Sequence, residues 1–187
     1  MRLETERLIL RSWESRDHAP LAAVLGDPEV RRFYPSTATP EQTLAQLASS
    51  IDKQAATGFH FGAAELKATG QFVGLIGLGY IPEQTRAAIR GQPAVEIGWQ
   101  FDKAFWGQGL APEGARGWLD YGFGTLGLPE IVAFTYAGNL PSQRVMAKIG
   151  MTRDPDADFE HPGLAPGHPL RPHVVYRIAN PDTFLNV

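Results

Sequence analysis

The chain has 187 residues, of which 43% are hydrophobic and 20% are charged, and its formal net charge is −3. This length suits one domain with a sizeable core, so we expect a single domain over residues 1–187. The mildly acidic balance argues against nucleic acid or an anionic membrane as a partner. Without cysteine, disulfides, thiolate metal sites and cysteine nucleophiles are excluded. Because neither a bilayer-spanning stretch nor a secretion signal is visible, we expect a cytoplasmic location.

The first part of the sequence predicts one strand followed by two helices. Residues 7–11 predict a short strand, and residues 17–25 predict a helix that ends at a glycine. The next helix has a clearer start, because Thr39 and Gln42 have the spacing of a capping box and Pro40 suits the first helical position. Apolar residues then follow at helical spacing, which supports the second helix.

Three strands are predicted next, at residues 59–66, 71–82 and 94–101. The middle one is nearly continuous in apolar residues, which is typical of a strand covered on both faces. Residues 83–93 contain proline, glycine and charged side chains, and they predict a mobile connection. Gly98 lies inside the last of these strands, where a glycine indicates a bulge or the close approach of another group.

The second half of the chain alternates between helices and strands. In order, the sequence predicts a helix at 110–123, a strand at 130–136, a helix at 140–149, a strand from 151, a loop over 154–171 and a strand at 173–178. The whole order predicts an α+β domain with one mixed sheet.

A glycine-rich turn carries the clearest chemical signal in the sequence. A strand ends, a short connection follows, and Gly107-Gln108-Gly109-Leu110-Ala111 then opens a helix. Glycines let successive backbone N–H groups point the same way, and a helix N-terminus adds free N–H groups and the positive end of its dipole. The pattern predicts an anion site that fits a pyrophosphate, with an ordinary strand-to-helix turn as the alternative.

Two other nucleotide-binding patterns fit poorly. The dinucleotide fingerprint requires glycine where Pro112 stands, and an acidic residue at the end of the next strand, which this sequence lacks. A phosphate-binding loop of the other common type requires a Gly-Lys-Ser/Thr ending that is also missing. A nicotinamide-dependent oxidoreductase therefore stays only as a weaker hypothesis.

Four segments resemble the GNAT-superfamily N-acetyltransferases, in the branch that includes the ribosomal-protein N-terminal (alanine/serine) acetyltransferases. They are ETERLILRSW at 4–13, TGQFVG at 69–74, VEIGW at 95–99 with FWGQGLA at 105–111, and NLPSQRVM at 139–146 with KIGM at 148–151. The resemblance covers nearly the whole chain, and its last two segments are specific in combination.

The resemblance implies an α+β domain with a three-layer fold, and it also implies an acetyl-transfer reaction. The fold has one mixed, mostly antiparallel central sheet of about six or seven strands, splayed in the middle, with helices on both faces. The implied activity moves an acetyl group from acetyl-CoA directly to a primary amine in a ternary complex, without a metal. The acceptor would be a protein N-terminal α-amine or a small-molecule amine, and the protein a monomer or homodimer. A non-catalytic CoA-binding sensor or interaction domain is the alternative.

The same resemblance assigns residues to the cofactor. The pyrophosphate would lie on the backbone of residues 108–111 and the pantetheine along residues 99–101. Pro112 departs from the Ser or Thr common in the family, but a proline is tolerated in the first helical turn. The implied cofactor residues are Trp99, Gln100, Phe101, Gly107, Gln108, Gly109, Leu110, Ala111, Asn139, Ser142 and Arg144.

The chemistry needs a base, donors to the oxyanion and a partner for the leaving thiolate. Many relatives have a tyrosine where this chain has Met146, and Ser142 is the implied partner of the sulfur instead. Its alternative role is to hydrogen-bond its own helix. Glu96 is the first candidate base, acting through water, and an outward-facing strand residue is an equal alternative. His60 is a minor candidate.

Aromatic residues and histidines give weaker signals. Phe33, Tyr34, His60 and Trp99 are the candidate acceptor-binding residues, although aromatic residues are equally often part of a core. Three further histidines lie in the proline-rich stretch of residues 160–173, where irregular spacing favours a loop over a metal site.

Overall fold

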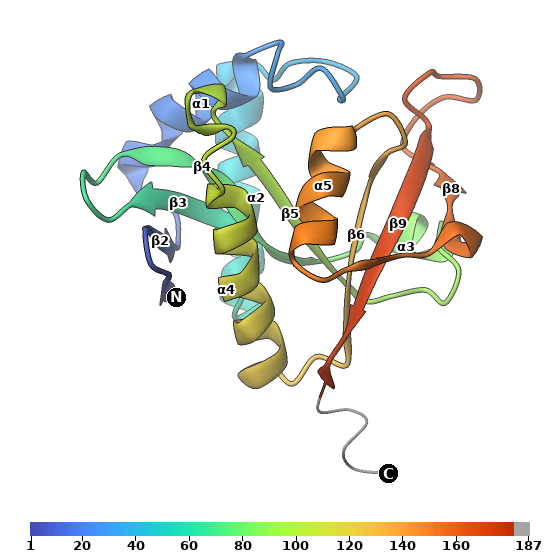
Figure 1. Ribbon diagram of the computed structural model, residues 1–187. Helices are drawn as coiled ribbons and strands as arrows, with labels where there is room; N and C mark the ends of the chain where they lie inside the picture. The colour runs from blue at the N-terminus through green and yellow to red at the C-terminus, as the bar shows by residue number, and fades with distance from the viewer. Residues whose placement is uncertain (182–187) are drawn as a thin grey trace. The chain divides into compact units, whose positions relative to one another are not determined.

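The structure, a computed structural model, describes residues 1–181, and Figure 1 labels most of its helices and strands. The chain divides into two compact units: the first contains Met1–Gly79 and Gly98–Trp118, and the second contains Tyr80–Ile97 and the residues from Leu119 onward. Strand β5 (Val95–Phe101) and helix α4 (Leu110–Gly124) each run from one unit into the other. The single domain stays a prediction.

The first unit is built on antiparallel strands. They are β1 (Arg2–Glu4), β2 (Leu8–Arg11), β3 (Gly62–Leu66) and β4 (Phe72–Tyr80), and each pairs antiparallel with the next. The end of β5 lies beside the start of β4, because the N–H of Asp102 donates to the carbonyl of Val73 at 2.9 Å. Short 3-10 helices at Ser15–Asp17 and Lys103–Phe105 complete the unit.

Two helices cover one face of these strands. Helices α1 (His18–Gly26) and α2 (Pro40–Thr57) contact each other. Their shared core contains Trp13, Leu21, Val24, Leu25, Val30, Leu47, Ala63 and Leu75. The predicted capping box is confirmed: the Thr39 hydroxyl accepts from the Gln42 N–H at 3.2 Å, and the Gln42 side chain accepts from the Thr39 N–H at 2.9 Å.

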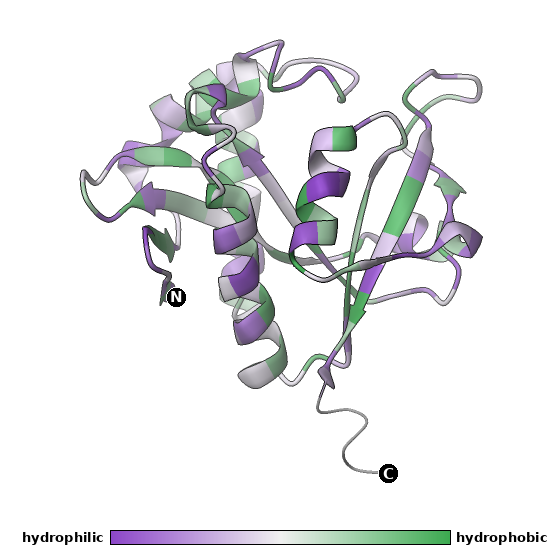
Figure 2. Cartoon of the chain, in the orientation of Figure 1, coloured by the Kyte–Doolittle hydropathy of each residue, from purple (hydrophilic) through white to green (hydrophobic). Residues whose placement is uncertain are grey.

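The start of α4 packs on the side chains of the opposite face. A Cβ atom on Gly114 would lie 3.2 Å from Ile76 and 3.3 Å from Leu8, and one on Gly117 would lie 2.9 Å from Thr5. The two glycines therefore let the helix backbone approach the strands closely. Figure 2 shows hydrophilic residues along the side of α4 that faces the viewer. The first unit thus has helices on both faces of its strands, as predicted.

The second unit is organised around β6 (Glu130–Tyr136) and β9 (Pro172–Ala179), which pair antiparallel along the whole of β6. The short strands β7 (Thr152–Arg153) and β8 (Phe159–Glu160) also pair with β9. The helices are α3 (Glu83–Ala88), α5 (Leu140–Lys148) and a 3-10 helix at Pro155–Ala157. One core of this unit contains Ile81, Ile89, Val132, Ala157, Phe159 and Val175.

The pairing of β5 with β6 is parallel and short. Within the second unit, its register consists of Glu96 opposite Val132. All the other described pairings are antiparallel, so the predicted mixed, mostly antiparallel sheet is confirmed, whereas the splay at its middle stays a prediction. The described residues form nine strands, and the two that the sequence did not indicate are β1 and β8.

The connection predicted over residues 83–93 is wrong in its first part, which forms α3. Pro82 precedes this helix, Arg86 pairs with Glu83 one turn earlier, and Ile89 is buried in the core of the second unit. A helix this short gives little periodicity in sequence, which explains the error.

None of the helices in residues 1–181 has the length and hydrophobicity that crossing a membrane requires.

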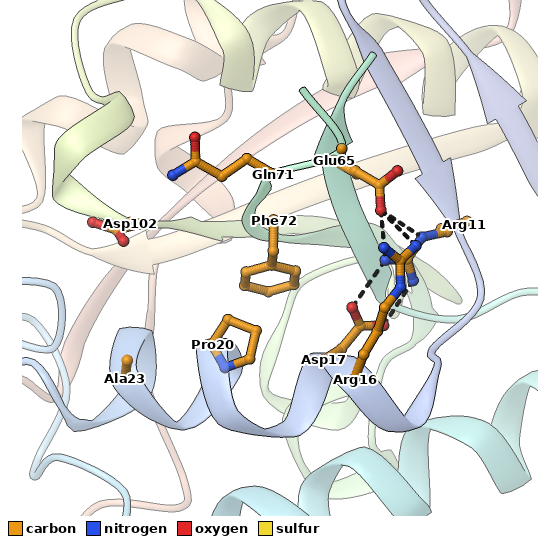
Figure 3. A pocket seen from close by; sticks show the side chains of 10 residues that line it. Arg11, Arg16, Asp17, Pro20, Ala23, Glu65, Gln71, Phe72 and Asp102 are labelled. Atoms are coloured by element: carbon orange, nitrogen blue, oxygen red, sulfur yellow. Dashed lines mark hydrogen bonds and ion pairs between the residues drawn. The ribbon is translucent and has the colours of Figure 1, made fainter. Parts of the chain in front are cut away.

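A buried ion-pair network ties β2, β3 and the start of α1 together (Figure 3). The Arg11 guanidinium binds both carboxylate oxygens of Asp17, at 2.7 and 2.9 Å, and a Glu65 oxygen at 2.8 Å. These three residues are 5%, 1% and 7% exposed. The hydrogen bonds to Asp17 raise the pKa of Arg11, so this guanidinium is charged at neutral pH. It lines a pocket of about 340 Å³.

Replacing Arg11 by alanine would leave two buried carboxylates without their main partner. We expect the free energy of unfolding, measured by urea denaturation, to fall by about 3–5 kcal/mol. Arg16→Ala is the matched control, because Arg16 contacts the same Glu65 from an exposed position. The control should lose far less stability, and equal losses in the two variants would contradict a structural role for the buried pair.

Candidate functional site

The glycine-rich turn has a run of free backbone donors. Gly107 and Gly109 have φ values of 75° and 78°, a region that other residues rarely adopt. Helix α4 begins at Leu110, so the N–H groups of its first turn have no acceptor within the helix. Within residues 1–181, the N–H groups of residues 107–111 have no hydrogen-bond acceptor. This arrangement fits the predicted anion site.

Arg7 is a cation beside this turn that the sequence analysis did not find. Its Nη1 donates to the Gln108 carbonyl at 3.0 Å, although the two residues are 101 positions apart. Its Nε pairs with Glu113 at 2.6 Å, and Glu113 also accepts from the Thr5 hydroxyl. Burial raises the pKa of Glu113, but the hydrogen bonds from Thr5 and Arg7 lower this pKa by more than burial raises it. The pKa of Glu113 is therefore lowered overall. Arg7 therefore compensates the Glu113 charge next to the turn.

The end of β5 carries the residues that were predicted to follow the pantetheine. Trp99 and Gln100 are partly buried, whereas the side chain of Phe101 is buried in the core. The Phe101 carbonyl accepts from the Trp106 indole at 2.8 Å. The Gln100 side chain accepts from Arg31 at 3.1 Å. These residues lie on a strand, as predicted, whereas Arg31 was not among the predicted site residues.

Asn139 and Ser142 form a hydrogen-bonded group at the start of α5, in the second unit. The Asn139 amide donates to the Ser142 hydroxyl oxygen at 3.0 Å and to Thr135 at 2.9 Å. Its carbonyl oxygen accepts from the Ser142 N–H at 3.3 Å, which caps the helix. Within residues 1–181 the Ser142 hydroxyl has no acceptor for its own proton. The hydroxyl is therefore oriented by Asn139 and not by its own helix backbone.

The segment after α1 brings two of the four predicted acceptor residues together with cations. The guanidinium of Arg31 lies 3.8 Å from the centre of the Tyr34 ring. The guanidinium of Arg32 lies 4.7 Å from the Phe33 ring and 4.8 Å from the Trp106 ring. The segment thus combines aromatic surface with positive charge, in the same unit as the glycine-rich turn.

His60 is packed and uncharged. It is 8% exposed, its ring contacts Phe61, and a Cβ on Gly79 would lie 3.2 Å from its Nδ1 atom. Burial, together with the positive charge of Lys53, lowers its pKa to about 4. A base this weak is poorly suited to remove a proton from an ammonium group near pH 7. The structure therefore favours the packed-histidine interpretation over the catalytic one.

Two other candidates lie in the second unit. Glu96 is partly buried on β5, and Arg144 is exposed on α5. In the same unit, the rings of His161 and His173 lie 4.8 Å apart, centre to centre. Within residues 1–181, no group of three or more histidine, aspartate or glutamate side chains is arranged to hold a metal.

Comparisons with known proteins identify the family. The acetyltransferase (GNAT) domain matches residues 7–152. Among curated proteins, the uncharacterized protein YkkB of Bacillus subtilis is 37% identical over 151 residues, which are 80% of this chain and 84% of that protein. The uncharacterized N-acetyltransferase YoaA of the same organism is 30% identical over 155 residues, 81% of this chain and 83% of that protein.

Solved structures agree with this result. A GNAT-family acetyltransferase from Bacillus anthracis superposes with a TM-score of 0.78 at 26% identity, covering 96% of this chain and 99% of that one. A ribosomal-protein-S5-alanine acetyltransferase from Vibrio fischeri shares the fold, with a TM-score of 0.74, 17% identity and coverage of 97% and 98%. The chain therefore belongs to the GNAT acetyltransferase family. It is an acyltransferase, in a family that uses acetyl-CoA.

The low pKa of His60 predicts a pH dependence of stability. The unfolded chain binds a proton at His60 near pH 6.5, whereas the folded chain does so only near pH 4. Between these values the unfolded state binds more protons, so the free energy of unfolding should fall by up to about 3 kcal/mol as the pH drops from 7 to 4. Urea denaturation across this range measures the fall. His60→Gln should remove this part of the slope, and an unchanged slope would contradict the assignment.

Proposed function

We propose that the protein is an N-acetyltransferase that moves the acetyl group of acetyl-CoA directly to a primary amine in a ternary complex. The run of unpaired N–H groups at residues 107–111, held by two glycines at the start of α4, carries this proposal. The acceptor is a protein N-terminal α-amine or a small-molecule amine. Acetylation of such amines inside the cell agrees with the cytoplasmic location expected from the sequence.

In this proposal the two ends of the cofactor meet different groups. The pyrophosphate accepts hydrogen bonds from the backbone of residues 107–111, with the Arg7 guanidinium nearby. The pantetheine arm follows the backbone of residues 99–101, and Asn139 is a further residue that we assign to the cofactor. The exposed Arg144 contributes a positive charge for the remaining phosphate. These contacts bind the cofactor mainly through the backbone, which explains why the motif is rich in glycine.

The transfer itself forms one bond and breaks another. The neutral amine attacks the thioester carbonyl, the carbon–sulfur bond breaks, and the CoA thiolate leaves while the amine nitrogen loses a proton. We assign Ser142 to the thiolate, because Asn139 fixes its oxygen and its proton is free to be donated. We assign Glu96, through water, to the proton that the amine loses.

A site without a strong base suits an acceptor amine of low pKa, because such an amine is already partly neutral. An α-amine has a pKa of about 7.7–8.0 and is partly neutral at pH 7, whereas a lysine near 10.4 costs roughly 4–5 kcal/mol to deprotonate. Since His60 is too weak a base, a weakly basic amine is the easier acceptor.

Met146 stands where many relatives have a tyrosine, which favours a non-catalytic CoA sensor as the second candidate. Transfer of labelled acetyl groups to a panel of amines separates the two functions.

The phosphate position is tested at Gly109. Gly109→Asp adds a negative charge within the run of N–H donors, so the affinity for CoA should fall by about 100-fold or more. Gly109→Asn is the matched control, because asparagine has nearly the same size and tolerates the positive φ equally well. Calorimetric titration with CoA measures both variants. If they bind CoA equally well, the pyrophosphate lies elsewhere.

The role of Ser142 is tested by Ser142→Ala. Loss of a hydrogen bond to the leaving sulfur should lower kcat by about 10- to 100-fold while the Kd for CoA changes little. Steady-state kinetics and CoA titration separate the two effects. Thr135→Val serves as the control, because it removes the other partner of Asn139 and leaves the serine hydroxyl in place. Wild-type turnover in Ser142→Ala would remove this residue from the chemistry.

A further inference from the structure

The Arg31 guanidinium is held in a fixed position by three neighbours. Its Nε donates to the Ser36 carbonyl at 3.1 Å, and its Nη1 donates to the Gln100 side chain at 3.1 Å. Its plane stacks on Tyr34, 3.8 Å from the ring centre. All three contacts are to neutral groups. The guanidinium is therefore oriented, but nothing in these contacts neutralises its charge.

Arg31 differs from Lys103, which pairs with the two acids of the segment that carries Arg31. Within residues 1–181 no carboxylate forms an ion pair with Arg31, and its Nη2 has no acceptor. The two acids of the same segment, Asp27 and Glu29, both pair with Lys103, at 2.8 and 3.4 Å. Burial lowers the pKa of Arg31, which reflects the cost of taking its charge out of water. A partly buried guanidinium without an anion is unusual in proteins and indicates that the anion comes from a ligand.

The place of Arg31 identifies the ligand to which this anion belongs. Gln100 lies on the strand assigned above to the pantetheine arm, which is the uncharged part of the cofactor. The cofactor phosphates have their own donors at residues 107–111 and Arg7. Arg31 also lies beside Tyr34, which the sequence analysis assigned to the acceptor.

We propose that Arg31 binds a carboxylate of the acceptor, so that the substrates of this enzyme are amines that also carry a carboxylate, such as amino acids or peptides with an acidic side chain near the N-terminus. This inference rests on the proposed function for the position of the acceptor. A guanidinium presents several N–H donors in one plane, and the free Nη2 side of Arg31 suits a carboxylate. Arg31 thereby determines specificity and takes no part in proton transfer.

The test compares amines in matched acid and carboxamide forms, with the same carbon chain and with the carboxylate at different distances from the amine. We expect the wild-type enzyme to have a kcat/KM about 10- to 100-fold higher for the acid than for the carboxamide in the best pair. Arg31→Gln should remove this preference, mainly by lowering the activity on the acid. Arg32→Gln is the matched control, since it removes a neighbouring positive charge and should keep the preference.

Calorimetric binding of the same pairs to the CoA-bound protein provides a readout that does not need turnover. Arg31-dependent binding of the acid supports the inference even where no amine is acetylated, in which case only the proposed function fails. Acetylation of acid and carboxamide with equal kcat/KM overturns the inference and leaves the proposed function in place. A loss of CoA affinity in Arg31→Gln, with no change in acceptor preference, also overturns it, because the anion would then be a cofactor phosphate.

Discussion

The candidate site depends on a set of backbone N–H groups that find no hydrogen-bond acceptor within the described fold. A helix leaves its first N–H groups without partners, and here Gly107 and Gly109 extend that run to the residues before the helix. Gly114 and Gly117 hold the same helix close to the strands, and Arg7 and Glu113 tie its first turn to the β1–β2 connection. The unpaired donors are thus fixed in place before any ligand binds, which lowers the entropic cost of binding.

The distribution of charge distinguishes cations that pair with carboxylates from Arg31, which contacts neutral groups. Arg11 is neutralised by Asp17 and Glu65, Arg7 by Glu113, and Lys103 by Asp27 and Glu29. Apart from Arg11–Asp17, whose residues are six positions apart, these pairs join segments that are distant in sequence, so the charges serve the fold. Arg31 instead contacts the neutral side chain of Gln100. A cation that is held by neutral groups keeps its capacity to bind an anion from outside.

Local signals in the sequence predicted the local structure well. The capping box at Thr39 and the strand at residues 130–136 follow from residue types and spacing, and the glycine-rich turn was found for the same reason. Contacts between distant residues could not be found in this way. Arg7 meets Gln108 across 101 positions and Arg31 meets Gln100 across 69, and no pattern within either segment indicates its partner. The glycine-rich turn was therefore predicted as a set of backbone positions, without Arg7 beside it, and Arg31 was not predicted either.

The carboxylate partner proposed for Arg31 also bears on the chemistry of the amine. A carboxylate close to an ammonium group stabilises the charged form and raises the pKa of that amine. When Arg31 pairs with the carboxylate, this effect is largely cancelled, so the amine loses its proton more easily. An enzyme without a strong base benefits directly, and the pKa of His60 makes it a poor one. The same guanidinium would then select the acceptor and increase the fraction of it that is able to attack the thioester.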